Sequence, residues 1–204
     1  GDYFDSFDLS TETQITNFLD IIEFKKSKQK EVVLLIGNHD LHYIRHPEKI
    51  VTGYQVIGSF KICPTIGKHL HHLKVCHKED NFLFTHAGVT ETFLKENGYS
   101  EEQSIEEFLN ELFRYRIRRF ELKNGNPYGD DIYQSPMWVR PRSLMKDSKN
   151  LKKQGIVQIV GHTGQNKIDI KGKATGSKFF FIDTLGTSKE YLIIEDGEFK
   201  LGKI

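Results

Sequence analysis

The sequence predicts an α/β fold in which two mixed β-sheets pack face to face, with helices on their flanks. Helix-type and strand-type patterns alternate in the first half of the chain, whereas strand-type runs follow one another closely in the last third. Polar motifs also come directly after several apolar runs. The carboxyl ends of strands in α/β sheets are where ligands collect, so these motifs mark one edge of the predicted sheet.

The composition indicates one soluble globular domain over residues 1–204. Hydrophobic residues make up 37% of the chain and charged residues 28%, enough for a sizeable core. A formal charge of +1 argues against a broad electrostatic surface for duplex nucleic acid or membrane, so a small partner is expected. Cys63 and Cys76 form no CxxC pair, which is typical of a reducing cytoplasm, although one disulfide stays open. We therefore expect a cytoplasmic protein.

Two amphipathic helices are predicted. The first covers Ser10–Lys30, where a capping-box pattern precedes apolar residues at helical spacing. The second runs from Ser100 to about Leu122, repeats the same pattern and ends before Asn-Gly-Asn-Pro at residues 124–127.

Strands are predicted where short apolar runs are bounded by glycine or charged turns, namely at residues 31–36, 70–76, 81–85, 156–160, 178–182 and 191–194. The second and third runs flank a Lys-Glu-Asp turn at 78–80 and so predict a hairpin. Several histidines fall in or beside this hairpin, at positions 69, 71, 72 and 77. They either bind a metal or line an exposed strand, and alternation along the run favours the exposed strand.

Four short motifs carry the candidate chemistry: Gly1-Asp-Tyr-Phe-Asp5, Gly37-Asn-His-Asp40, Thr85-His-Ala-Gly88 and Gly161-His-Thr163. Each alone is more often an ordinary loop than part of a site. Together they offer a carboxylate, an amide and two imidazoles, a set that suits a borderline divalent ion such as Mn²⁺, Fe²⁺ or Zn²⁺. These four candidate ligands are Asp2, Asn38, His86 and His162.

In this order the motifs resemble those of the calcineurin-like metallophosphoesterases, whose pattern runs DxH, GDxxD, GNH(D/E), a strand-borne His and GH. The sequence is also similar to the phosphoprotein-phosphatase branch, which includes bacterial and phage serine/threonine phosphatases and diadenosine tetraphosphatases. Met137-Trp-Val-Arg140 resembles the WxR of that branch, and Gly161-His-Thr163 has one His rather than GHxH. The resemblance implies an αββα sandwich that, because no DxH precedes Gly1, lacks its first strand and DxH loop.

The same resemblance implies a role for each matching residue. Asp2 is similar to the carboxylate that bridges two metal ions, and the second ion's other ligands correspond to Asn38, His86 and His162. His39 resembles the general acid that protonates the leaving group, and Asp5 the carboxylate that orients it. Arg140 resembles the arginine that holds the substrate phosphate.

The implied function is a phosphatase with two divalent ions, expected to be Mn²⁺, with Fe or Zn as alternatives. It would hydrolyse phosphate monoesters, of phosphoproteins or small metabolites, by direct attack of a metal-bound hydroxide. Ser6 and Phe7 stand where many protein phosphatases have Arg-Gly, which weakens the protein-substrate interpretation. Two alternatives stay open: a dinucleoside polyphosphate hydrolase, and an inactive or single-metal fragment that acts as a binding module. Without its first strand, the chain would expose strand edges through which a homodimer can form.

Overall fold

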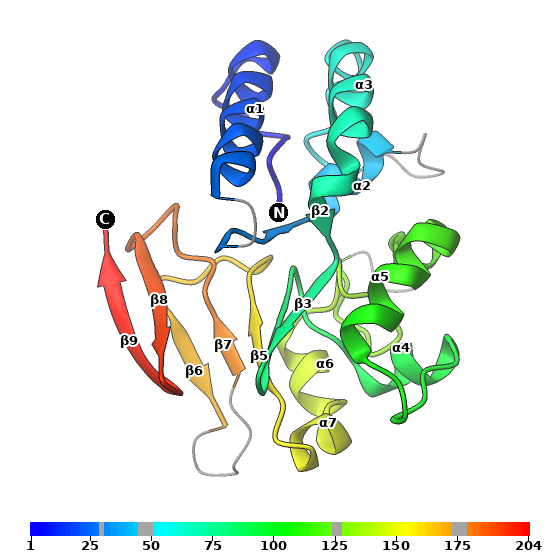
Figure 1. Ribbon diagram of the computed structural model, residues 1–204. Coiled ribbons are helices and arrows are strands. Elements are labelled where there is room, and N and C mark those ends of the chain that lie inside the picture. Colours follow the sequence, from blue (N-terminus) through cyan, green and yellow to red (C-terminus); the bar gives the residue numbers. More distant parts are fainter. Residues whose placement is uncertain (29–30, 45–50, 124–127, 173–178) are drawn as a thin grey trace. The chain divides into compact units, whose positions relative to one another are not determined.

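The computed structural model describes residues 1–28, 31–44, 51–123, 128–172 and 179–204. The chain divides into two compact units, residues 1–75 and residues 76–204, and each unit has its own arrangement of helices and strands (Figure 1). The interpretation of the whole chain as one domain stays a prediction. No helix in the described ranges is both long enough and apolar enough to cross a membrane.

Unit 1 is mainly helical and contains one short parallel strand pair. Its elements are α1 (Thr11–Lys28), β1 (Leu34–Leu35), α2 (Asn38–Ile44), α3 (Ser59–His69), the 3-10 helix η2 (Leu70–His72) and β2 (Leu73–Lys74). Leu34 pairs with Leu73. The apolar faces of α1 and α3 are buried, and the Phe4 ring reaches Phe18 of α1 with 5.2 Å between centroids. This packing fixes the segment before α1, which carries the first polar motif.

The predicted helix at residues 10–30 is confirmed as α1, with residues 29–30 outside the described ranges. The strand predicted over residues 31–36 is shorter, since only Leu34–Leu35 pairs. The strand predicted at 70–76 is wrong in its first part, because Leu70–His72 forms a 3-10 turn and His69 ends α3 as a buried residue. Pro64 and Gly67 obscured α3 in the sequence, yet Ile62 and Ile66, four residues apart, form its buried face.

Unit 2 is built on a mixed sheet of five strands in the order β3-β4-β5-β7-β6. The three inner strands β4, β5 and β7 are parallel, and the edge strands are antiparallel to their neighbours. The bounds are β3 (Cys76–Glu79), β4 (Phe82–Thr85), β5 (Val157–Val160), β6 (Asp169–Lys171) and β7 (Phe179–Phe181). A second sheet is the antiparallel pair β8 (Glu190–Glu195) and β9 (Glu198–Lys203).

The two sheets of unit 2 pack against each other through aromatic and branched residues. Phe180 on the five-stranded sheet meets Phe199 of β9 with 4.9 Å between ring centroids, inside a cluster that also takes Leu192 and Ile194 of β8. On the other face, Phe179 and Phe181 join Leu144 of α6 in a second cluster. The helices of unit 2 are α4 (Glu91–Glu96), α5 (Ile105–Arg116), η3 (Ile117–Phe120), α6 (Pro141–Lys146) and α7 (Lys149–Lys153). An α/β fold with a mixed sheet and flanking helices is thus confirmed.

Sequence predictions for unit 2 are correct for several strands of the sheets and less so for the helices. A hairpin is present as β3 and β4, but its first strand lies later than predicted, because Lys78 and Glu79, expected in the turn, pair with β4. Three later strands are confirmed as β5, β7 and β8. The helix predicted from Ser100 begins instead at Ile105, because the Ser104 side chain accepts the hydrogen bond from Glu107 N. Its end tightens into the 3-10 helix η3. The short helices α4, α6 and α7 and the strands β6 and β9 were not predicted.

Candidate active site

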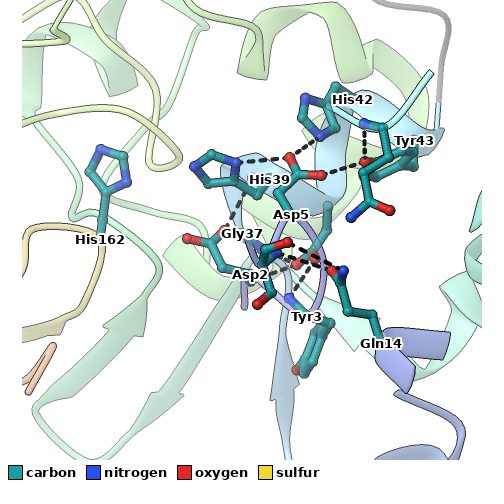
Figure 2. Close-up of polar contacts among 12 residues, drawn as sticks. Asp2, Tyr3, Asp5, Gln14, Gly37, His39, His42, Tyr43 and His162 are labelled. Carbon is teal, nitrogen blue, oxygen red and sulfur yellow. Dashed lines mark hydrogen bonds and ion pairs between the residues drawn. The ribbon is translucent and has the colours of Figure 1, made fainter. Parts of the chain in front are cut away.

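The Asp5 carboxylate is the centre of a polar cluster in unit 1 (Figure 2). Its Oδ2 lies 2.9 Å from His39 Nδ1 and 2.6 Å from His42 Nε2, and its Oδ1 accepts a hydrogen bond from the Tyr43 hydroxyl. All three partners belong to α2, where spacings of three and four residues put side chains on one face. The structure therefore brings together His39 and Asp5, the two residues predicted to form the proton-donating pair.

The pKa values of this pair are shifted apart. Burial would raise the pKa of Asp5, but its polar contacts with His39, His42 and Tyr43 outweigh burial and hold that pKa below its usual value. For His39, burial would lower the pKa, whereas the hydrogen bond to Asp5 and the nearby charge of Asp2 raise it overall. These directions favour the ionised form of Asp5 and the protonated form of His39.

Asp40 holds the first motif against the second. Its fully buried carboxylate accepts hydrogen bonds from the backbone N of Asp2 at 2.8 Å, of Tyr3 at 2.7 Å and of Gly37 at 2.8 Å. Burial, followed by the charge of Asp2, raises the pKa of Asp40 to about 6. The backbone N of His39 in turn donates to Asp2 Oδ1 at 3.1 Å. Residues 1–3 are thus fixed onto the loop that follows β1.

Gly37 has no room for a side chain. A Cβ at this position would lie 2.0 Å from Asp2 Oδ1 and 2.5 Å from the backbone N of Asp2. Asn38, the next residue, is buried at the first position of α2. The Gly-Asn-His order therefore allows close approach of Asp2 and then turns directly into the helix that carries His39.

Backbone strain coincides with the predicted site. Asp2, Asp5 and His162 adopt left-handed conformations, with φ of 62°, 73° and 65°. Each such residue costs on the order of 1–3 kcal/mol, and strain of this kind gathers at functional sites. Six non-glycine residues in the described ranges have positive φ, and three of them are predicted site residues. In both units the backbone is therefore strained at the motifs.

Sheet register brings together the two histidines of unit 2. His86 follows β4 and His162 follows β5 by one glycine, and these parallel strands are paired Thr85 to Val160. Gly161 N donates to His86 O at 2.9 Å, and His86 Nε2 lies 3.1 Å from His162 Nδ1. Both imidazoles therefore share the carboxyl edge of the sheet, as the position of the motifs predicts.

Arg140 lies beside the His162 loop. Its Nε donates to Tyr128 O at 2.7 Å, and one terminal nitrogen donates to Thr163 Oγ1 at 3.1 Å and to His162 O at 3.3 Å. Burial lowers the pKa of Arg140, and the carboxylates of Asp130 and Asp183 act in the opposite direction. The guanidinium is thus oriented by backbone oxygens in unit 2.

Comparison with known protein families shows to which family this chain belongs. Residues 1–183 match the model of the calcineurin-like phosphoesterases. The chain belongs to the calcineurin-like phosphoesterase family. No match was found among the curated proteins.

Solved structures share the fold of this chain. A cold-active protein-tyrosine phosphatase of the psychrophile Shewanella sp. is 19% identical and aligns with a TM-score of 0.56. That alignment covers 84% of this chain and 56% of the Shewanella chain. A second structure of a cold-active protein tyrosine phosphatase, 18% identical, gives a TM-score of 0.52 over 83% and 57% of the two chains. The present chain thus spans just over half the length of these neighbours.

Several residues of the candidate site were not predicted from the sequence. Asp40 stands in the second motif but was assigned no role, and Tyr43 gave no signal of its own. His42 was given no role, although its position three residues after His39 is a signal that both side chains lie on one helix face. Gln14 clamps the loop after Asp5, since its Oε1 accepts from Ser6 N at 3.1 Å and its Nε2 donates to Leu9 O at 2.9 Å.

Proposed function

We propose that this chain carries the catalytic machinery of a metal-dependent phosphatase of the phosphoprotein-phosphatase branch, acting on phosphate monoesters of proteins or small metabolites. The observation that carries the proposal is the pair formed by Asp5 and His39. The Asp5 side chain is 2% exposed and that of His39 is 31% exposed, with 2.9 Å between the carboxylate and Nδ1. A buried carboxylate that holds a partly exposed imidazole is the arrangement a general acid requires.

His39 is proposed to act at the leaving-group oxygen. As the P–O bond to this oxygen breaks, Nε2 gives its proton to the oxygen, and the leaving group departs as a neutral alcohol. Asp5 keeps the other ring nitrogen protonated and stabilises the cationic imidazole before transfer. Such a positioned acid typically contributes about 10²–10⁴-fold to the rate.

The donor chemistry fits divalent metal ions. His86 Nε2 and His162 Nδ1 lie 3.1 Å apart, and two ligands at right angles on an ion with bonds of about 2.1 Å are about 3 Å apart. Two bound ions would supply water activation and neutralise charge on the phosphoryl oxygens. By family resemblance the proposed ligands are Asp2, Asn38, His86 and His162, and Mn²⁺ is the proposed metal, with Fe or Zn as alternatives.

Arg140 is proposed to bind the substrate phosphate. A guanidinium can bond two phosphate oxygens at once, which an ammonium group cannot do with the same geometry. The contacts of Arg140 with Tyr128 O and His162 O hold the side chain in place before substrate arrives. Less conformational entropy is then lost when phosphate binds.

The test compares two phosphate esters whose leaving groups need the acid to different degrees. With Mn²⁺, the protein should hydrolyse phenyl phosphate and p-nitrophenyl phosphate. His39→Ala should lower kcat for phenyl phosphate by roughly 10²-fold or more and affect p-nitrophenyl phosphate less, with bound metal unchanged. His71→Ala, which removes an exposed histidine of the same unit, is the control. Equal loss of metal and rate in His39→Ala would refute the acid assignment, and turnover of neither ester would refute the phosphatase.

A further inference from the structure

We infer that His42 is a positioning residue that holds the Asp5 carboxylate in the orientation required by His39. This inference rests on the proposed role of His39 as the general acid. It assigns to a residue outside the four motifs a supporting role behind the proposed proton donor.

Asp5 Oδ2 is shared by two imidazoles. His39 Nδ1 lies 2.9 Å from this oxygen and His42 Nε2 lies 2.6 Å from it (Figure 2). The two rings are nearly perpendicular, with 87° between their planes and 5.9 Å between their centroids. They therefore approach the oxygen from different directions and do not compete for one position.

Exposure separates the tasks of the two histidines. The side chain of His42 is 4% exposed, against 31% for His39. The His42 ring is enclosed edge-on by Tyr43 and Tyr54, whose ring centroids lie 4.5 Å and 5.0 Å away. His39 can thus meet a substrate, whereas His42 can act only through its neighbours.

The polar contacts of His42 indicate a role beyond packing. Apart from its contact with Asp5, neither of its ring nitrogens has a hydrogen-bond partner in the described part of the chain. A buried imidazole that is so poorly satisfied costs stability. An aromatic or aliphatic side chain would fill the same space at lower cost, so the contact with Asp5 is the feature that accounts for a histidine here.

Together with Tyr43, His42 fixes both carboxylate oxygens of Asp5. The Tyr43 hydroxyl, itself held by a 2.9 Å hydrogen bond from Gln55 N, donates to Oδ1. His42 occupies one side of Oδ2, and His39 meets the other side. The carboxylate therefore has little freedom to rotate, and its contacts with Tyr43 and His42 set the direction in which it holds His39. Losing His42 should free Oδ2 and so misdirect the acid.

The first test measures leaving-group dependence in His42→Ala. Outer groups that orient a catalytic centre typically contribute about 10–100-fold, so kcat for phenyl phosphate should fall by that order. The effect on p-nitrophenyl phosphate should be smaller, and KM should stay near its starting value. His42→Gln, which keeps a side-chain N–H near the place of Nε2, should recover much of the loss and also serves if His42→Ala does not fold. His69→Gln, another buried histidine of unit 1, controls for stability and should leave kcat unchanged.

The second test places His42→Ala in a protein that already carries His39→Ala. If His42 works through His39, the second substitution should change kcat by less than about twofold, because groups that act as a unit are not additive. A full additional loss, or an equal loss on both esters in His42→Ala alone, would overturn the inference in favour of a structural role.

Metal analysis of the same variants tests a competing interpretation. Asp5, His39 and His42 offer three ligand atoms within 4.8 Å of one another, so the cluster itself is a candidate for an ion. Loss of one metal equivalent in His42→Ala would overturn the positioning role, and unchanged metal content supports it. If His39→Ala lowered kcat equally for phenyl phosphate and p-nitrophenyl phosphate, this result would instead refute the proposed role of His39 on which the inference rests.

Discussion

The two units position their candidate site residues by different means. In unit 1, helix α2 presents His39, His42 and Tyr43 on one face. His39 and Tyr43 form hydrogen bonds with the Asp5 carboxylate. In unit 2, two adjacent parallel strands deliver His86 and His162 to one edge of the sheet. A helix face positions groups through spacing in sequence, whereas a sheet edge positions them through pairing between distant segments.

This difference suggests a division of chemical roles. Unit 1 carries the residues of the proposed proton transfer and two of the proposed metal ligands, and unit 2 carries the other two proposed ligands and the proposed phosphate-binding arginine. Substitutions at Asp5, His39 or His42 in unit 1 should therefore change kcat in a way that depends on the leaving group. Substitutions in unit 2 should change metal content or KM instead.

The largest effect is expected for His86→Ala. Removal of this proposed metal ligand should lower bound metal and reduce kcat/KM by on the order of 10³-fold, since metal ions contribute several kcal/mol to phosphoryl transfer. His77→Ala is the matched control, because His77 in the same unit bonds Glu106, with 3.2 Å between Nδ1 and Oε1. Metal analysis by mass spectrometry and steady-state kinetics measure both effects. Full metal content in His86→Ala would remove this residue from the ligand set.

A pair of glycine substitutions compares how tightly each unit is packed at its motif. In Gly37→Ala the new Cβ would lie 2.0 Å from Asp2 Oδ1, whereas in Gly161→Ala it would meet only His86 O at 3.7 Å. Overpacking costs about 1–3 kcal/mol, so Gly37→Ala should lower both the free energy of unfolding and the activity by a corresponding factor. Gly161→Ala should be nearly neutral in denaturant unfolding and in kcat. Equal effects of the two would contradict the close approach at Gly37.

The placement of His86 and His162 in unit 2 could be predicted from the sequence, whereas the hydrogen bonds that hold Asp2 in place in unit 1 could not. Apolar strand runs ending in His86 and near His162 are visible in one dimension, and parallel pairing follows from the fold class. The contacts of Asp40 with the backbone of Asp2 and Tyr3 depend on packing across 37 or 38 residues. No local pattern encodes them, so that support was found only in the structure.

The prediction of helices and strands is limited in the same way, because it sees local patterns and not tertiary packing. Strands buried in a sheet were predicted because burial imposes a continuous apolar run, as in β5 and β7. Helix α3 was missed because Pro64 and Gly67 signal a break, and packing against α1 overrides that local preference. The short strands β1 and β2 contain two residues each, too few for a periodic pattern to mark their ends.

Arg140→Lys tests the proposed phosphate contact of unit 2. Lysine keeps the charge but loses the fork that bonds two oxygens, so KM for phenyl phosphate should rise by roughly 10-fold while kcat changes less. Arg142→Lys, an exposed position in α6 two residues further on, is the control. A fall in kcat that depends on the leaving group, with KM unchanged, would move Arg140 to the proton-transfer side of the site.

The smallest effects should still separate the two units. Tyr43→Phe removes the hydroxyl that donates to Asp5 Oδ1, and Thr163→Val removes the oxygen that accepts from Arg140 at 3.1 Å. A single hydrogen bond contributes about 0.5–1.5 kcal/mol, which corresponds to a change of a few fold in each case. Tyr43→Phe also leaves Gln55 N without its acceptor, so its free energy of unfolding should fall, whereas Thr163→Val keeps the shape of the side chain. In kinetics, Tyr43→Phe should lower kcat for phenyl phosphate more than for p-nitrophenyl phosphate, and Thr163→Val should raise KM for both esters. If both variants changed the same parameter, the assignment of proton transfer to unit 1 and phosphate binding to unit 2 would be wrong.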